Sequence, residues 1–144
     1  MRVYLACTIR GDRSALPAVR VIRDTLVRLG HEVMTERFLD DRAEAEDGTL
    51  TERDVFHRDI DWLDACDLLV AEASGSSYGV GFEVGYILAR AEHSGQRVVL
   101  LYDRVQHDRI SRLISGNDHP HCRTVAYGSL DELPGLLEGA IPSA

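Results

Sequence analysis

Residues 67–85, DLLVAEASGSSYGVGFEVG, join a short apolar run to a glycine-rich turn and then to a helical pattern. The apolar run predicts a buried strand, and the turn after it predicts a helix from about Gly81 to Glu92. Backbone N–H groups at the start of a helix attract phosphate, and the same partial positive charge favours an ionised carboxylate. We expect Glu83 in the first turn of this helix. This strand–turn–helix unit therefore predicts an anion site with a carboxylate beside it.

Further apolar runs of β-forming residues flank this unit. The expected strands are Arg2–Cys7, Glu32–Thr35, Asp67–Ala71, Arg97–Tyr102 and Cys122–Tyr127. Helical patterns lie between them, and this alternation is typical of a parallel sheet covered by helices. The 144 residues have the length of one domain, residues 1–144. We therefore predict a single-domain α/β fold, a doubly wound Rossmann-like or flavodoxin-like sheet of about five parallel strands with helices on both faces.

The other expected helices also follow from spacing and caps. Residues 19–29 repeat apolar side chains at helical spacing, and Gly30 is the expected C-terminal cap. A start resembling a capping box at Thr51–Asp54 predicts a second helix that continues to Leu63. Two shorter helices are expected at about Asp108–Ile114 and Leu130–Leu137. Ligands of such sheets bind beyond the carboxyl ends of the strands.

Charge and composition exclude several classes of partner. The net charge of −8 disfavours a nucleic-acid polymer, although one arginine and a helix terminus can still bind a single phosphate. No apolar stretch approaches the roughly 20 residues that span a bilayer, and the N-terminus does not resemble a signal peptide. We therefore expect no membrane partner and a cytoplasmic location. Three cysteines at unrelated spacings predict reduced thiols rather than a disulfide framework.

Two carboxylates are candidates for chemistry. Asp59 precedes Trp62 on the second helix, where its side chain borders the apolar face, whereas Asp61 and Asp64 are expected only to contact solvent. Asp59 and Glu83 together make the pair used in glycosidic cleavage, in which one acid protonates the leaving group and the other attacks or stabilises the sugar cation. Such carboxylates lie roughly 5 Å apart in retaining enzymes. The structural alternatives are a surface acid that complements the helix dipole for Glu83 and a half-exposed carboxylate for Asp59.

Another group of residues suits a phosphate. Thr8, Arg10 and Gly11 supply a hydroxyl, a guanidinium and flexible backbone just past the first strand, with Ser77 opposite them. The alternative is a loop with one surface arginine. The glycine spacing GxGxxxG matches neither the dinucleotide fingerprint nor the P-loop, and the cluster His119–Cys122 lacks a second ligand pair at zinc spacing. We therefore expect neither a cofactor nor a metal.

A stripe of small residues is predicted on the helix that carries Glu83. Gly81, Gly85 and Ala89 fall at i, i+4 and i+8. Such a stripe lets another backbone approach closely, either the sheet or a helix of a partner chain.

Several motifs resemble a known family in order along the chain. They are YLACTIRG at residues 4–11, RDIDWLDACDLLVAE at 58–72, SYGVGFEVG at 77–85 and SRLISG at 111–116. The most specific feature is the combination of the second motif with Glu83, which follows Asp59 by 24 residues. On these motifs the chain resembles the nucleoside 2-deoxyribosyltransferase superfamily, and within it the 2′-deoxynucleoside 5′-phosphate N-hydrolases.

This resemblance implies cleavage of a deoxynucleoside 5′-monophosphate, a small nucleotide, into free base and 2-deoxyribose 5-phosphate. Glu83 would attack C1′ and form a transient glycosyl-enzyme, Asp59 would act as general acid and then help activate water, and Tyr4 would orient the nucleophile. The residues implied for the 5′-phosphate are Thr8, Ile9, Arg10, Gly11, Ser77 and Gly79. Ser111, or alternatively Ser115 or Asn117, would complete the neighbouring site in a homodimer.

Two other functions stay open on the sequence. Base exchange between unphosphorylated deoxynucleosides is disfavoured by Arg10, whose guanidinium would lack a phosphate. A non-catalytic nucleotide sensor on the same sheet would leave the two carboxylates unexplained.

Overall fold

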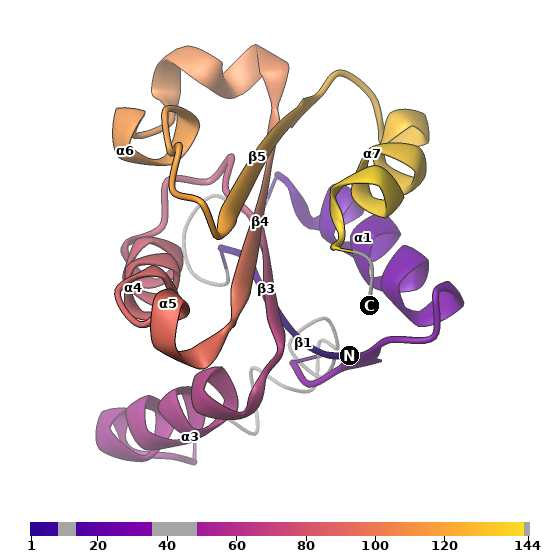
Figure 1. Cartoon of the computed structure of the whole chain (residues 1–144). Helices are drawn as coiled ribbons and strands as arrows, with labels where there is room; N and C mark the ends of the chain where they lie inside the picture. The colour runs from indigo at the N-terminus through magenta and orange to yellow at the C-terminus, as the bar shows by residue number, and fades with distance from the viewer. Residues whose placement is uncertain (9–13, 36–48, 143–144) are drawn as a thin grey trace.

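The computed structural model describes residues 1–8, 14–35 and 49–142. Five strands form one sheet in the order β2-β1-β3-β4-β5, and every neighbouring pair is parallel (Figure 1). The strands are β1 Arg2–Ala6, β2 Glu32–Val33, β3 Leu68–Glu72, β4 Arg97–Asp103 and β5 Cys122–Tyr127. The predicted α/β class is confirmed, and of the two predicted arrangements the order is the flavodoxin-like one.

Helices connect and cover the strands. They are α1 Leu16–Arg28, α3 Glu52–Ala65, α4 Tyr78–Leu88, α5 Ala91–Ser94, α6 Arg112–Ser115 and α7 Leu133–Ala140, with short 3-10 helices η2 Arg104–Arg109 and η3 Leu130–Glu132. Gly30 follows α1 with a φ of 80°, and Thr51 forms a capping box with Asp54 at the start of α3, as predicted. No helix in the described part of the chain is long and apolar enough to cross a membrane.

The sheet is covered on both faces. Leu68 and Val70 of β3 pack in one apolar cluster with α1 and α7, and Leu69 and Ala71 pack in a second cluster with α3 and α4. Figure 1 shows α1 and α7 on one side of the sheet and α3, α4 and α5 on the other. A strand buried on both faces needs apolar side chains at every position, which explains the continuous apolar run of β3.

Helix α4 begins earlier than the sequence predicted. Ser77 is its N-cap, and the Ser77 Oγ accepts a hydrogen bond from the Val80 N–H (3.5 Å). Tyr78 is therefore the first helical residue, and the prediction of a start at Gly81 is wrong because a serine cap stands before the glycines. The predicted single helix over 81–92 is divided into α4 and the short α5.

The predicted helix over Asp108–Ile114 is also wrong. Asp103 and Ser111 are both capping residues, with their side-chain oxygens accepting from the Val105 and Leu113 N–H groups. Each cap starts a separate short helix, η2 and α6, with an extended Ile110 between them.

Strand β2 is shorter than predicted, because the side chain of Thr35 replaces further backbone pairing. The Thr35 Oγ accepts from the Leu5 N–H at 2.9 Å and donates to the Leu5 carbonyl at 2.8 Å. The strand order reverses between β1 and β3, and the carboxyl ends of these two strands flank the crevice where such sheets bind ligands.

Candidate active site

Tyr4 of β1 and Glu83 of α4 are in direct contact. The Tyr4 hydroxyl donates a hydrogen bond of 2.8 Å to Glu83 Oε1. Burial, with smaller contributions from the negative charges of Glu83 and Asp59, raises the pKa of Tyr4 far above its usual value. Tyr4 therefore stays a neutral phenol that donates to the carboxylate.

Glu83 is the sixth residue of α4, outside the first turn where the helix dipole acts. Burial raises the pKa of Glu83 to about 7, against the hydrogen bond from Tyr4, which lowers it, and with a smaller upward contribution from the charge of Asp59. The predictions that Glu83 lies in the first turn and is favoured in its ionised form are therefore wrong, because α4 begins at Tyr78 and desolvation dominates. A carboxyl with a pKa near neutrality is poised for a catalytic role.

Asp59 is the second carboxylate of the cluster. Its Oδ1 accepts a 2.9 Å hydrogen bond from Arg58 Nε, and its side chain is 25% exposed, which is the border position that the sequence predicted. The charge of Asp59 raises the pKa of both Tyr4 and Glu83, so the three groups lie within electrostatic reach of one another. Strand β1 and helices α3 and α4 thus bring together two carboxylates and a phenol.

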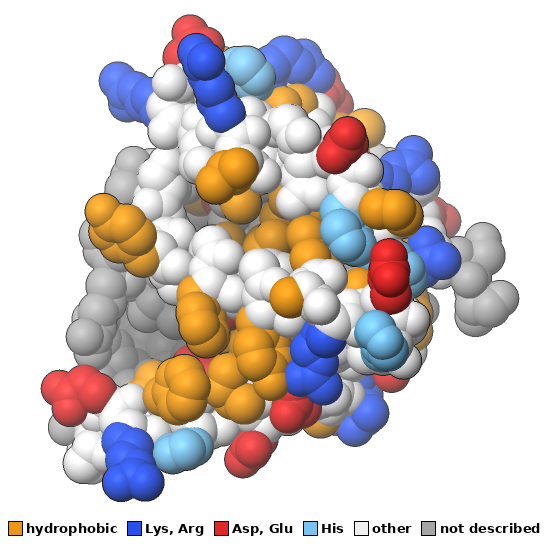
Figure 2. Space-filling view, turned by 60° about the vertical axis from the view of Figure 1, so that its left-hand side comes forward, with side chains coloured by type: hydrophobic (Ala, Val, Ile, Leu, Met, Phe, Trp, Pro, Cys, Tyr) orange, Lys and Arg blue, Asp and Glu red, His pale blue; other side chains and the backbone are white. Residues whose placement is uncertain are grey.

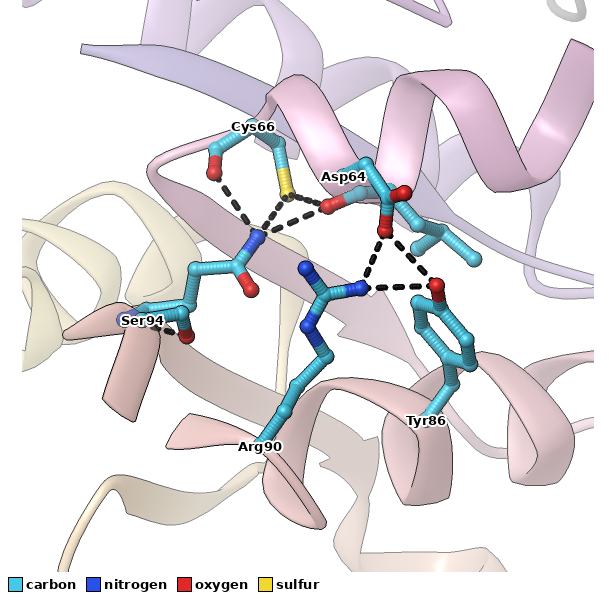
Figure 3. Close-up of polar contacts among 7 residues, drawn as sticks. Asp64, Cys66, Tyr86, Arg90 and Ser94 are labelled. Carbon is cyan, nitrogen blue, oxygen red and sulfur yellow. Dashed lines mark hydrogen bonds and ion pairs between the residues drawn. The ribbon is translucent and has the colours of Figure 1, made fainter. Parts of the chain in front are cut away.

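A polar link joins the two helices that carry the carboxylates (Figure 3). Asp64 near the end of α3 accepts a 2.7 Å hydrogen bond from the Tyr86 hydroxyl and pairs with Arg90. Arg90 also donates to the Tyr86 hydroxyl at 2.7 Å, and its guanidinium lies 5.0 Å from the centre of the Tyr86 ring. The prediction that Asp64 only contacts solvent is therefore wrong.

The C-terminal end of α3 has a second, buried attachment. Gln96 Nε2 donates to the carbonyl oxygens of Leu63 (2.7 Å) and Cys66 (2.9 Å), as Figure 3 shows for Cys66. These contacts satisfy carbonyl groups that a helix end leaves without intrahelical partners. Helix α3, and with it Asp59, is held against the chain that follows α4.

The structure describes only some of the residues that were predicted to bind the phosphate. Thr8 follows β1, is 6% exposed, and its Oγ1 has no hydrogen-bond partner among the described residues. A buried hydroxyl without a partner costs free energy, so this hydroxyl is available to a ligand at the end of β1. Ser77 caps α4, and Gly79 is the second residue of that helix. Ile9, Arg10 and Gly11 lie outside the described residues.

Ser77 and Ser111 line one cavity of about 420 Å³ between α4 and α6, together with apolar side chains that include Ile110. The lining of this cavity does not include Tyr4 or Glu83. Figure 2 shows hydrophobic side chains gathered around a hollow on this face of the molecule. Within one chain, Ser111 is therefore a neighbour of Ser77 rather than of the carboxylate cluster.

The stripe of small residues on α4 does not face the sheet. Gly81, Gly85 and Ala89 are exposed, and a Cβ added at Gly81 or Gly85 would meet no atom within 4 Å. Of the two predicted uses of the stripe, packing against the sheet is therefore wrong.

Known proteins resemble this chain over most of its length. Residues 3–115 match the nucleoside 2-deoxyribosyltransferase family. A Thermofilum pendens protein named 2′-deoxynucleoside 5′-phosphate N-hydrolase 1 is 41% identical over 144 residues, 100% of this chain and 97% of that protein. A Danio rerio protein named 5-hydroxymethyl-dUMP N-hydrolase is 30% identical over 142 residues, 96% of this chain and 94% of that protein. The structure of a Clostridium botulinum CMP N-glycosidase shares the fold, with a TM-score of 0.70 at 20% identity over 98% of this chain and 100% of that chain.

Proposed function

The chain belongs to the nucleoside 2-deoxyribosyltransferase family, and from this premise we propose that it hydrolyses the N-glycosidic bond of 2′-deoxynucleoside 5′-monophosphates. The products are the free base and 2-deoxyribose 5-phosphate. The observation that carries the proposal is the contact between Tyr4 and Glu83 beside Asp59, because glycosidic cleavage uses a pair of carboxyl groups. The names of the Thermofilum and Danio relatives support the same substrate class.

In the first step the Glu83 carboxylate attacks C1′ of the deoxyribose. The bond from C1′ to the base nitrogen breaks, its electron pair leaves with the base, and protonated Asp59 gives its proton to the departing base. The hydrogen bond from Tyr4 holds Glu83 Oε1, so Oε2 is the attacking atom. The result is a glycosyl-enzyme and an Asp59 carboxylate.

In the second step water attacks C1′ of the glycosyl-enzyme. The Asp59 carboxylate takes one proton from the water, the hydroxyl joins C1′, and the bond between C1′ and Glu83 breaks. Deoxyribose 5-phosphate leaves, while ionised Glu83 and protonated Asp59 are restored for the next cycle.

We assign the 5′-phosphate to the chain between β1 and α1 and to the start of α4. Thr8 supplies a buried hydroxyl, and Ser77 and Gly79 lie where α4 presents backbone N–H groups without intrahelical partners. Ile9, Arg10 and Gly11 are assigned to the same phosphate from the sequence alone, Arg10 as its charged partner.

We further propose a cytoplasmic homodimer. The exposed small stripe on α4 is free to approach a helix of a second copy, and Tyr78 and Leu113 are 99% and 84% exposed on the same side of the sheet. In that dimer the partner subunit's Ser111 completes the phosphate site. Cys66 and Cys122 carry free thiols, as is usual in a reducing cytoplasm.

Because we propose a dimer, the wild-type protein is expected to show a mass of about twice 16.0 kDa in sedimentation equilibrium. Gly85→Arg is expected to give the single-chain mass, because the new side chain has room within one chain but blocks a close helix pair. Gly135→Arg on α7 is the matched control, since it also has free space, and should stay dimeric. A wild-type protein that sediments as one chain would contradict the proposal.

An assay of base release tests the function itself. The purified protein is incubated with each of the deoxynucleoside 5′-monophosphates and their ribose counterparts, and released base is separated by chromatography. Adding a second, free base distinguishes a transferase, which makes a new nucleoside. Calorimetric binding of a nucleotide without release of base from any substrate would overturn the proposal and favour a sensor.

The pKa of Glu83 predicts the alkaline limb of the pH profile. The reaction needs one proton in the pair of carboxyl groups, carried by Asp59 while ionised Glu83 attacks. That proton is lost as the pH rises past the pKa of Glu83 beside charged Asp59, so kcat/KM is expected to fall above about pH 7. Tyr4→Phe removes the hydrogen bond that lowers this pKa, and the limb should therefore move to higher pH. Tyr102→Phe, which removes a hydroxyl elsewhere on the sheet, should leave the limb in place. A limb that stays or moves to lower pH in Tyr4→Phe would contradict the assigned contact.

A further inference from the structure

A third carboxylate lies at the edge of the sheet and has no part in the proposed reaction. Glu72 is the last residue of β3 and is 1% exposed. Side chains alternate along a strand, and Ala71 belongs to the cluster under α4, so Glu72 points to the opposite face, where α1 and α7 lie. Glu72 is therefore separated by the sheet from the cluster of Tyr4, Asp59 and Glu83.

Glu72 is bound by three donors. Its Oε1 accepts hydrogen bonds from the Ser74 hydroxyl and from the Tyr127 hydroxyl (2.8 Å), and its Oε2 accepts from the Ser74 N–H (3.2 Å). The Ser74 Oγ in turn accepts from the Asp103 N–H at 2.8 Å. The carboxylate thus binds the end of β5 directly through Tyr127, and through Ser74 it joins the ends of β3 and β4 to the first residues after β3.

The stability of the core does not account for a carboxylate at this position. Burial raises the pKa of Glu72, which reflects the cost of removing its charge from water. An apolar side chain would avoid that cost, and the other four residues of β3 are apolar. What a carboxylate adds is a set of directed hydrogen bonds to Ser74.

The segment that follows Ser74 is held in an unusual conformation. Ser76 has a φ of 49°, a left-handed conformation that few residues other than glycine adopt, and its hydroxyl donates to the Arg109 carbonyl at 3.0 Å. Ser77 comes next and caps α4. Because Ser74 and Ser76 are both anchored, the backbone between them has little freedom, and the position of Ser77 follows from theirs.

We propose that Glu72 is a positioning residue for phosphate binding: it fixes Ser74, and thereby the segment that places Ser77 and the start of α4 against the 5′-phosphate. The inference rests on the proposed function, because it concerns the phosphate of that substrate. Glu72 itself touches neither the phosphate nor the sugar.

Removing the carboxylate should weaken phosphate binding more than the chemical step. Glu72→Ala is expected to raise KM for a deoxynucleoside 5′-monophosphate by about tenfold or more, the loss typical of hydrogen bonds to a charged group. The value of kcat at saturation should stay within about threefold, because the catalytic cluster lies on the other face of the sheet. Steady-state kinetics on the full chain separates the two constants.

Control variants separate positioning from a general loss of stability. Val70→Ala alters the same face of the same strand, so it should lower the melting temperature and leave KM unchanged. Glu72→Gln keeps an oxygen acceptor, so its KM for the nucleotide should lie much closer to that of the wild type than the KM of Glu72→Ala does. If Glu72→Ala does not fold, Ser74→Ala removes the contacted hydroxyl while keeping the carboxylate, and it should show the same rise in KM.

Calorimetric titration with inorganic phosphate provides a readout that needs no turnover. We expect the wild type and Val70→Ala to bind phosphate and Glu72→Ala to bind it about tenfold more weakly or worse. A wild type that binds phosphate but releases no base, with binding lost in Glu72→Ala, would refute the proposed function and leave the role of Glu72 standing. Phosphate affinity and KM within twofold of the wild type in both Glu72→Ala and Ser74→Ala would overturn the inference.

Discussion

Glu83→Gln is expected to lower kcat by about 10⁴-fold or more, because the variant loses the carboxylate that we propose attacks C1′. Glutamine has nearly the shape of glutamate, and its amide oxygen can still accept the hydrogen bond from Tyr4. The variant should therefore fold and bind a deoxynucleoside 5′-monophosphate with wild-type affinity. Rates of base release, together with calorimetric binding of the same nucleotide, measure the two effects separately.

Glu92→Gln on α5 is the matched control for this variant, because it changes an exposed glutamate on the following helix. It should keep the wild-type rate. Mass spectrometry of the acid-quenched wild type should find the deoxyribose phosphate adduct on Glu83 and find none in Glu83→Gln. A Glu83→Gln rate within tenfold of the wild type would exclude Glu83 as the nucleophile.

The architecture could be predicted because its determinants are local. The apolar run of β3 and the capping box at Thr51 are fixed by neighbouring residues. The capping box lies where the sequence places it, and β3 begins and ends one residue later than predicted. The boundaries that differ depend on a competing side chain. Ser77 starts α4 before its glycines, and the hydroxyl of Thr35 takes the place of further β2 pairing.

The residues of the candidate cluster could be named from the sequence, but their electrostatic environment could not. The motifs around Asp59 and Glu83 contain the two carboxylates that the structure brings within electrostatic reach, whereas the direction of the pKa shift of Glu83 depends on how deeply it is buried. Tyr86 and Arg90 are recognisable as i, i+4 neighbours on a helix. Their partner Asp64 is 22 residues from Tyr86 along the chain and meets it only through helix packing, which no local pattern encodes.

Asp59→Asn is expected to lower kcat by about 10²- to 10⁴-fold, the range for loss of a positioned general acid or base. The same change removes the group that carries the proton, so the remaining rate needs only ionised Glu83 and should no longer fall above about pH 7. Tyr4→Phe is expected to keep that alkaline limb and move it to higher pH, and a general distortion of the site would not produce both results. Rates measured from about pH 5 to 9 give both results.

The leaving group provides a further test of Asp59. A base that departs readily without protonation needs little help from a general acid, so Asp59→Asn should be least impaired on the substrate with the best leaving group. Asp61→Asn, two residues along α3 and exposed, should match the wild type throughout. If Asp59→Asn instead loses the same factor with every base and keeps the fall in kcat/KM above about pH 7, Asp59 is not the proton donor, and its carboxylate only orients the groups around Glu83.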